Sequence, residues 1–445
     1  MQTFITKKHQ EDCIEAIKNI VSYPSVLNEG ENGTPFGQSI QDVLEATLEL
    51  CKSLGFKTFI DPDGYYGYAE VGSGEEQLAL LCHLDVVPVG DMNLWETDPF
   101  EVVEKDGYLY GRGTQDDKGP SMAALYAVKA LMDAGVEFDK RIRFIFGTDE
   151  ETLWRGLDQY TAKEEPATMG FAPDAEFPLT YAEKGLLQAK LVGPISDVLS
   201  LNVGGAYNVV PGKVTYEGKL TEEIALQLDG LGFDYEKGDD TITVLGKSIH
   251  SKDAPEGINA AVRLAFALSE LVSHPVLNFI VDEVGEDATG SALLGTIQDE
   301  PTGSLSLNIA GYSLSQEGSE IKLDIRIPVL ADKESLVEEL KRKAAPYNLT
   351  YEEVDYLAPL YVPLDSNLVG TLMDVYKEKT NDVHAKPKSS GGATFARTMQ
   401  NCVAFGAVFP DSEITFHMEN EKMSLRDIFG AMDIYAEAVY RLAAK

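Results

Sequence analysis

The sequence predicts an α/β fold: a mixed, mostly parallel sheet flanked by helices, interrupted by an inserted α+β domain. Strand and helix patterns alternate in the first third of the chain, which is typical of a parallel sheet covered by helices. Strand patterns then cluster in the middle of the chain, and the helical pattern returns after Pro363. We therefore expect a discontinuous domain over 1–184 and 361–445, with an insertion over 185–360.

The first third supplies the elements of the expected parallel sheet. Residues 41–54 have the apolar spacing of a helix. Residues 77–82 (QLALLC) form a short apolar run, which indicates a strand buried on both faces. A helix follows over 121–134, which is rich in Ala, Leu and Met. Polar and apolar residues then alternate over 141–146 (RIRFIF), which predicts a second strand.

The middle of the chain changes in character from about residue 185. Strand patterns occur in LLQAKLVG, LSLNV, KVTYEGKL, TITVLG, SLSLNIAGYSL, IKLDIRI and LTYEEVDYL. Helices are expected over 258–272 and 333–344. After Pro363 we expect a helix over 367–379, a Gly-Gly turn, a strand over 402–409 and a terminal helix. These boundaries are expected to shift by several residues.

The charge balance excludes some partners. Among 445 residues, 37 are Lys or Arg and 73 are Asp or Glu, which gives a net charge of −36. Such a surface repels phosphate backbones and anionic lipid, so we expect neither a nucleic-acid nor a membrane partner. No apolar run is long enough to span a membrane, and the N-terminus has an amphipathic pattern rather than that of a signal peptide. The four cysteines form no CxxC motif. We therefore expect a reducing, cytoplasmic location.

Histidines and acids recur where strands or turns are expected to end. Each has an ordinary alternative reading, such as a capped loop histidine, an N-cap aspartate, a solvated acidic loop or an Asx turn. Together they form the His/Asp/Glu set expected for two divalent ions of zinc or manganese type. The candidate ligands are His83, Asp116, Glu151, Asp174 and His417.

Seven segments in the same order carry a family resemblance. They are CHLDVVP (82–88), GRGTQDDKGP (111–120), GTDEE (147–151), APDAEF (172–177), YAEKG (181–185), GKSIHSKDAPEGINA (246–260) and SGGATFAR (390–397). With these segments the chain resembles the two-metal peptidases of the aminoacylase and carboxypeptidase G type. Within that family it is most similar to the bacterial PepV-like, carnosinase-related dipeptidases. GRGTQDDKG together with GTDEE is the most specific match.

The resemblance implies a role for each candidate in the larger domain. The implied ligands of two divalent ions are His83, Asp116 and Asp174 for one ion, and Asp116, Glu151 and His417 for the other. Asp85 would orient the first histidine, and Glu150 would be the general base. The peptide bond after the shared aspartate would be cis, with Arg112 and Lys118 anchoring the loop. Zinc is the expected metal, with manganese or cobalt as alternatives.

The resemblance also implies that the inserted domain is a lid. His250 would stabilise the oxyanion, and the Gly-Gly turn of Gly391 and Gly392 would contact substrate. Asn208 and Arg326 would grip the substrate carboxylate, which the guanidinium fork can bind through two parallel hydrogen bonds. Without the resemblance, Arg326 would be interpreted as one partner of an ion pair on the surface of a strand, and Asn208 as a turn residue. The large insertion implies a monomer, because simpler members dimerise through a shorter lid.

The expected function is therefore a metal-dependent dipeptidase that hydrolyses dipeptides with free termini. A hydroxide bridging the two metal ions would be the nucleophile. Alternatives within the family are an N-acyl amino acid deacylase, a desuccinylase or a carboxypeptidase. Alternatives of other classes are a catalytically inactive metal-binding protein and a phosphoesterase, because two-metal sites also serve phosphate esters.

Overall fold

The computed structural model describes residues 3–30 and 32–445 and has two compact units. The first unit comprises Met1–Tyr181, Leu360–Lys388 and Thr394–Lys445. The second comprises Ala182–Pro359 and Ser389–Ala393. The Gly-Gly turn therefore belongs to the second unit, although the sequence around it lies beyond the expected end of the insertion. The role of the second unit as a lid stays a prediction.

The first unit is built around a mixed sheet in the order β1-β2-β6-β3-β7-β22-β9-β20, with β21 paired to β9. At its centre, β3 runs parallel to β6 and β7, and β22 runs parallel to β7. Antiparallel pairs flank this centre, β2 with β6 and β22 with β9. The strands are β1 Lys57–Ile60, β2 Gly67–Gly72, β3 Gln77–His83, β6 Arg141–Gly147, β7 Met169–Ala172, β9 Thr180–Glu183, β20 Leu360–Tyr361, β21 Lys388–Ser390 and β22 Cys402–Ala404. The predicted mixed α/β fold is confirmed.

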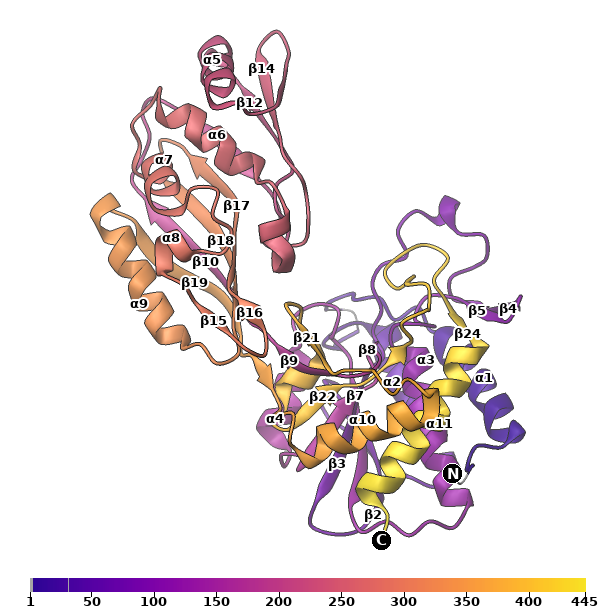
Figure 1. Ribbon diagram of the computed structural model, residues 1–445. Helices are drawn as coiled ribbons and strands as arrows, with labels where there is room; N and C mark the ends of the chain where they lie inside the picture. The colour runs from indigo at the N-terminus through magenta and orange to yellow at the C-terminus, as the bar shows by residue number, and fades with distance from the viewer. Residues whose placement is uncertain (1–2, 31) are drawn as a thin grey trace. The chain divides into compact units, whose positions relative to one another are not determined.

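Helices cover both faces of this sheet because its central strands are apolar on both sides. All seven residues of β3 are buried. Ala79 and Leu81 pack in one cluster with Leu157 and Tyr160 of α4. On the other face, α3 packs against α1 and α11, as Figure 1 shows for α3 and α11. The helices of the unit are α1 Lys7–Val21, α2 Gln38–Ser53, α3 Lys118–Asp133, α4 Arg155–Lys163, α10 Asn367–Thr380 and α11 Leu425–Ala443.

One expected strand differs from the structure. The pattern over 402–409 predicted a single strand, but the chain forms β22 and then the short strand β23 (Ala407–Val408). Gly406 lies between them with φ of 73°, a left-handed conformation that glycine adopts without cost. A Cβ at this position would lie 2.3 Å from the ring of Phe177. The backbone turns here because only glycine fits against that ring.

The second unit contains a five-stranded antiparallel sheet in the order β11-β17-β18-β10-β19. Buried and half-exposed residues alternate along β10, so one face is packed. The helices α6, α7 and α9 run along this sheet in Figure 1 and pack against its strands. The bounds are β10 Gly185–Gly193, β11 Leu201–Gly204, β17 Ser306–Leu314, β18 Ser319–Ile327, β19 Thr350–Leu357, α6 Ala260–Ser269, α7 Pro275–Phe279 and α9 Lys333–Ala344.

A smaller sheet and a helix complete the second unit. The sheet has the order β12-β14-β13, formed by Lys213–Glu217, Thr241–Leu245 and Tyr235–Lys237. The helix α5 (Thr221–Leu231) packs on it and was not expected from the sequence. No helix among residues 3–30 and 32–445 is long and apolar enough to cross a membrane.

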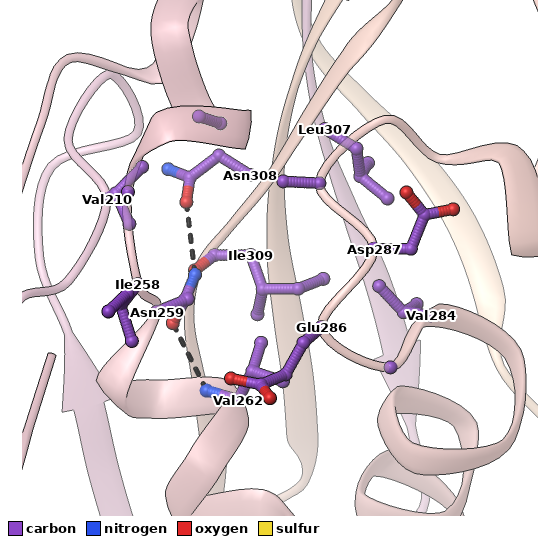
Figure 2. A pocket seen from close by; sticks show the side chains of 14 residues that line it. Val210, Ile258, Asn259, Val262, Val284, Glu286, Asp287, Leu307, Asn308 and Ile309 are labelled. Atoms are coloured by element: carbon purple, nitrogen blue, oxygen red, sulfur yellow. Dashed lines mark hydrogen bonds between the residues drawn. The ribbon is translucent and has the colours of Figure 1, made fainter. Parts of the chain in front are cut away.

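A small cavity of about 60 Å³ lies in the second unit beside the start of α6 (Figure 2). Asn259 caps α6 there, because its Oδ1 accepts the backbone N–H groups of Ala261 and Val262. Its Nδ2 donates to the carbonyl of Ile309 at 2.8 Å and to Oδ1 of Asn308 at 3.2 Å. One side chain thus ties the helix start to β17.

Candidate active site

The predicted metal ligands of the first unit gather where the central parallel strands end. His83 is the last residue of β3, Glu151 lies four residues beyond β6, and Asp174 lies two residues beyond β7. Asp116 lies in the turn just before α3, and His417 lies in an irregular segment before β24 (Lys422–Ser424). Open α/β sheets bind ligands at the carboxyl ends of their strands, so the sheet itself brings these residues together.

Asp116 lies between the two histidines and presents one carboxylate oxygen to each. Its Oδ1 is 2.9 Å from Nε2 of His83, and its Oδ2 is 3.1 Å from Nε2 of His417. His417 Nε2 also lies 3.0 Å from Oε2 of Glu151, and His83 Nε2 lies 3.7 Å from Oδ2 of Asp174. The five predicted ligands thus form two neighbouring groups that share one carboxylate.

The donor set fits divalent metal ions. Zinc bonds of about 2.0–2.1 Å in a tetrahedral site place neighbouring ligand atoms roughly 3.3 Å apart. The separations of 3.0 and 3.1 Å around His417 are close to this value. Two overlapping groups have ligand atoms within 4.8 Å of one another: His83, Asp116 and Glu151, and His83, Glu150 and Asp174. Glu150, the predicted base, therefore lies within the same cluster.

The carboxyl groups of this cluster are half-buried and lie close together. Burial raises the pKa of Glu150 well above its ordinary value, and the neighbouring Glu151 and Asp116 raise it further. Burial likewise raises the pKa of Asp174 well above its ordinary value, with Asp116 adding to the shift. For Asp116, burial is outweighed by hydrogen bonds with His417 and His83, which lower its pKa. A divalent cation would relieve this crowding of negative charge.

Asp85 contacts both His83 and the segment that carries Glu151. The carbonyl oxygen of Asp85 lies 3.0 Å from Nδ1 of His83, whereas the carboxylate of Asp85 lies 3.6 Å away. Oδ2 of Asp85 instead accepts the backbone N–H of Glu151 at 3.0 Å. Asp85 therefore faces the histidine with its backbone carbonyl and one carboxylate oxygen, and binds the backbone of Glu151 with the other. Its role as the group that orients His83 stays a prediction.

The turn that carries Asp116 is anchored as expected. The peptide bond between Asp116 and Asp117 is cis. Lys118 Nζ donates to the carbonyl of Tyr23 at 2.8 Å, and Arg112 Nη1 lies 2.7 Å from Oε2 of Glu421. Glu421 and its neighbour across the loop, Gln115, received no role from the sequence. Both are acidic or polar residues in polar runs, and only their burial in the fold distinguishes them.

The candidates of the second unit also lie near one another. Arg326 is 2% exposed and binds Asp324 through Nε at 2.6 Å and Nη2 at 3.0 Å. Its Nη2 also donates to Ser251 Oγ, and its Nη1 donates to the carbonyl of Gly391 at 3.1 Å. The double-donor edge expected to grip a substrate carboxylate is thus already bound to Asp324. One N–H of Nη1 remains for a ligand.

His250 and Asn208 lie beside this arginine network. Ser251, which accepts a bond from the arginine, donates its backbone N–H to the carbonyl of Asn208 at 2.9 Å. Nδ1 of His250 accepts the backbone N–H of Lys252 at 3.1 Å. Burial and the nearby Arg326 lower the pKa of His250, so its ring is neutral near pH 7 and Nε2 carries the proton.

A family model and bacterial relatives match this chain over most of its length. The model of Peptidase family M20/M25/M40 matches residues 79–441. A Bacillus subtilis protein named "Putative dipeptidase YtjP" is 34% identical over 98% of both chains. A Staphylococcus haemolyticus protein with a name of the same kind is 32% identical over 99% of this chain and 98% of its own.

Solved structures share the fold at lower sequence identity. Human carnosine dipeptidase 1 is 17% identical with a TM-score of 0.55, covering 97% of this chain and 96% of its own. Aminoacylhistidine dipeptidase from Vibrio alginolyticus is 12% identical with a TM-score of 0.59, covering 97% of both chains. These likenesses confirm the fold, and the family match covers most of the chain. The protein therefore belongs to peptidase family M20/M25/M40 and is a metallopeptidase hydrolase.

Proposed function

We propose that this metallopeptidase is a dipeptidase for dipeptides with free termini. The observation that carries the proposal is the position of Asp116, whose two oxygens face His83 and His417 beside the half-buried Glu150. A carboxylate shared by two histidine-containing ligand groups suits a pair of ions. The names of the bacterial relatives support dipeptides as the substrate class.

The residues present would hold two divalent ions, zinc by the donor types, with manganese or cobalt as alternatives. The ligands would be His83, Asp116 and Asp174 for one ion, and Asp116, Glu151 and His417 for the other. Such ions, when bound, supply Lewis acidity and lower the pKa of the attacking water. Glu150 would take a proton from that water and deliver it to the leaving amine.

We propose that the second unit supplies groups that bind substrate. The neutral His250 would donate Nε2–H to the carbonyl oxygen as it gains negative charge, a contribution typically worth about 10²–10³ in turnover. The remaining N–H of Arg326 and the exposed side chain of Asn208 would bind the C-terminal carboxylate. Gly391 and Gly392 would line the same region, since the arginine donates to the carbonyl of Gly391. The unit would act as a lid that limits substrate length.

Two further proposals concern the state of the protein in the cell. We propose a monomer, because the inserted unit is large, and sedimentation analysis of the purified protein would test this. We also propose a cytoplasmic location. Its support is that the four cysteines form no CxxC motif and are buried in the fold.

The experiment that tests the function uses one panel of matched substrates. The same dipeptide is offered with free termini, with an acylated amino terminus and with an amidated carboxyl terminus, and bound metal is measured on the same sample. We expect the free dipeptide to have the highest kcat/KM. Preference for the acylated substrate would instead indicate a deacylase. Two bound ions with no hydrolysis of any substrate would contradict the proposal.

A further inference from the structure

The two segments that carry Asp116 and His417 hold each other by side-chain hydrogen bonds. From the first segment, Gln115 is 5% exposed and its Oε1 accepts the backbone N–H groups of Thr415 at 2.7 Å and Phe416 at 2.9 Å. Its Nε2 donates to the carbonyl of Glu413 at 2.9 Å. One glutamine thus binds backbone groups of three of the four residues that precede His417.

Glu421, which follows His417 in the chain, binds the backbone of the turn that carries Asp116. Its side chain is fully buried, and its Oε1 accepts the backbone N–H groups of Gly113 at 3.0 Å, Gln115 at 2.9 Å and Asp116 at 3.2 Å. Its Oε2 lies 2.7 Å from Nη1 of Arg112, which supplies the opposite charge. The carboxylate of Glu421 therefore fixes the backbone of the turn from Gly113 to Asp116, and Asp116 is the carboxylate that the two ions would share.

The base of the His417 segment is also held by Thr415, which bonds the backbone of Lys422, and by Asn420, which bonds the backbone of Leu94 and Glu96. Next to His417 the segment is more exposed. The segment between β23 and β24 contains no helix or strand, and the side chains of Ile414 and Met418 are 47% and 55% exposed. His417 has φ of 63°, a backbone conformation that persists only where the surroundings impose it. Half of its side chain is exposed, so core packing does not hold the ring in place.

We propose that Gln115 and Glu421 are positioning residues that form a reciprocal clamp between the two ligand segments. The clamp sets the separation of Asp116 and His417, and through it the affinity for the ion that these two residues share. The inference rests on the proposed two-metal function. Residues that orient metal ligands are typically worth about 10–100-fold in metal affinity.

The test is a metal titration of the full-length Gln115→Met protein. Methionine has nearly the same size as glutamine but can make none of the bonds to Glu413, Thr415 and Phe416. We expect the dissociation constant for one of the two zinc ions to rise about 10–100-fold, while the other ion binds as in the unchanged protein. Saturating zinc should restore most of kcat, which a merely structural defect would not show.

Gln77 provides the matched control. It is 1% exposed at the start of β3, and its side-chain amide has no hydrogen-bond partner within the described part of the chain. Gln77→Met therefore makes the same chemical change in a buried site that lies at the far end of the strand from His83. We expect both zinc affinities to stay unchanged in this control.

Three further variants test the clamp without relying on Gln115→Met alone. Gln115→Glu keeps the acceptor for Thr415 and Phe416 but places a second carboxylate oxygen, with its negative charge, against the carbonyl of Glu413. The affinity of this variant for zinc should fall between those of the unchanged and Met proteins. Glu421→Gln should weaken the same ion, because its amide N–H₂ would face the donor of Arg112. If Gln115→Met fails to fold, Gln115→Asn, whose amide is one methylene too short, replaces it with the same expected loss.

Two results would overturn the clamp: unchanged affinity for both ions in the folded Gln115 variant, or equal weakening of both. The failure of the proposed function is visible separately in the unchanged protein. Two bound zinc ions without dipeptide hydrolysis would refute the dipeptidase and leave the clamp testable by titration. No zinc binding at all by the unchanged protein would refute both.

Discussion

At the scale of single residues, the site is organised around one shared carboxylate. Each oxygen of Asp116 faces a different histidine, and the two histidines come from opposite ends of the chain. Glu150 belongs to the same cluster, but within the residues that the structure describes it forms no ion pair with either histidine. A substitution of Glu150 can therefore test proton transfer without removing a predicted metal ligand.

Glu150→Gln makes this test. The amide keeps the size of the carboxylate but cannot take a proton from water, so turnover should fall by about 10²–10⁴-fold. Bound metal, measured by elemental analysis, should stay at two ions per chain. Turnover close to that of the unchanged protein would rule out Glu150 as the general base, and loss of metal would show that it is a ligand.

Arg326→Lys tests recognition of the substrate carboxylate. Lysine keeps a positive charge beside the buried Asp324 but cannot also reach Gly391 and a substrate with a planar fork. We expect KM for a free dipeptide to rise about 10-fold or more, because a hydrogen bond to a charged group contributes about 1.5–3 kcal/mol. KM for the amidated dipeptide serves as the control and should change little. Equal changes for both substrates would exclude this role.

The candidate ligands, which lie close together in the structure, could be named from the sequence, whereas the residues that hold them could not. His83 and Asp116 lie in short motifs with a specific spacing, and the resemblance adds their partners. Gln115 and Glu421 bind backbone groups, which leave no mark on the partner sequence, and they are separated by 306 residues. Among 73 acids, nothing local distinguishes a buried carboxylate from a solvated one.

At the scale of elements, patterns of burial predicted the central strands well. β3 and β6 begin at the predicted residues and extend one residue further, because strands buried on both faces have continuous or strongly apolar sequences. The break between β22 and β23 was missed because it depends on the Phe177 ring, which lies far away in the sequence. Helix α5 was not predicted, because the sequence on both sides of it has strand patterns.

Asn259→Ala tests how one capping residue stabilises the second unit. The alanine removes the cap of α6 and the bond to the carbonyl of Ile309. We expect the free energy of unfolding to fall by about 1–2 kcal/mol, measured by urea denaturation followed by circular dichroism. Asn259→Ser restores the cap acceptor and should recover part of the loss. A loss below a few tenths of a kcal/mol would show that water replaces these bonds.

At the scale of the whole molecule, the charge of −36 acts on stability as well as on partners. Like charges destabilise a compact state, and several carboxyl groups crowd the end of the central sheet. The metal ions would therefore contribute to stability in the unit that binds them.

Removal of metal should reveal this contribution. At a free zinc concentration one hundred times Kd, a single site stabilises the folded state by roughly 2.7 kcal/mol. We expect a chelator to lower the Tm of the protein by several degrees and to abolish hydrolysis. Zinc, manganese or cobalt added back should restore both. A Tm unaffected by the chelator, in a sample shown to lose its metal, would contradict a contribution to stability.

The order of β22 in the sheet has a consequence for synthesis on the ribosome. This strand is made from residues 402–404, yet it lies between β7 and β9, which are made more than two hundred residues earlier. Until it emerges, β7 has an open edge that invites pairing with other chains, so the nascent protein needs protection by chaperones. His417 emerges later still. If His417 is a metal ligand as proposed, hydrolytic activity would begin only when translation is nearly finished.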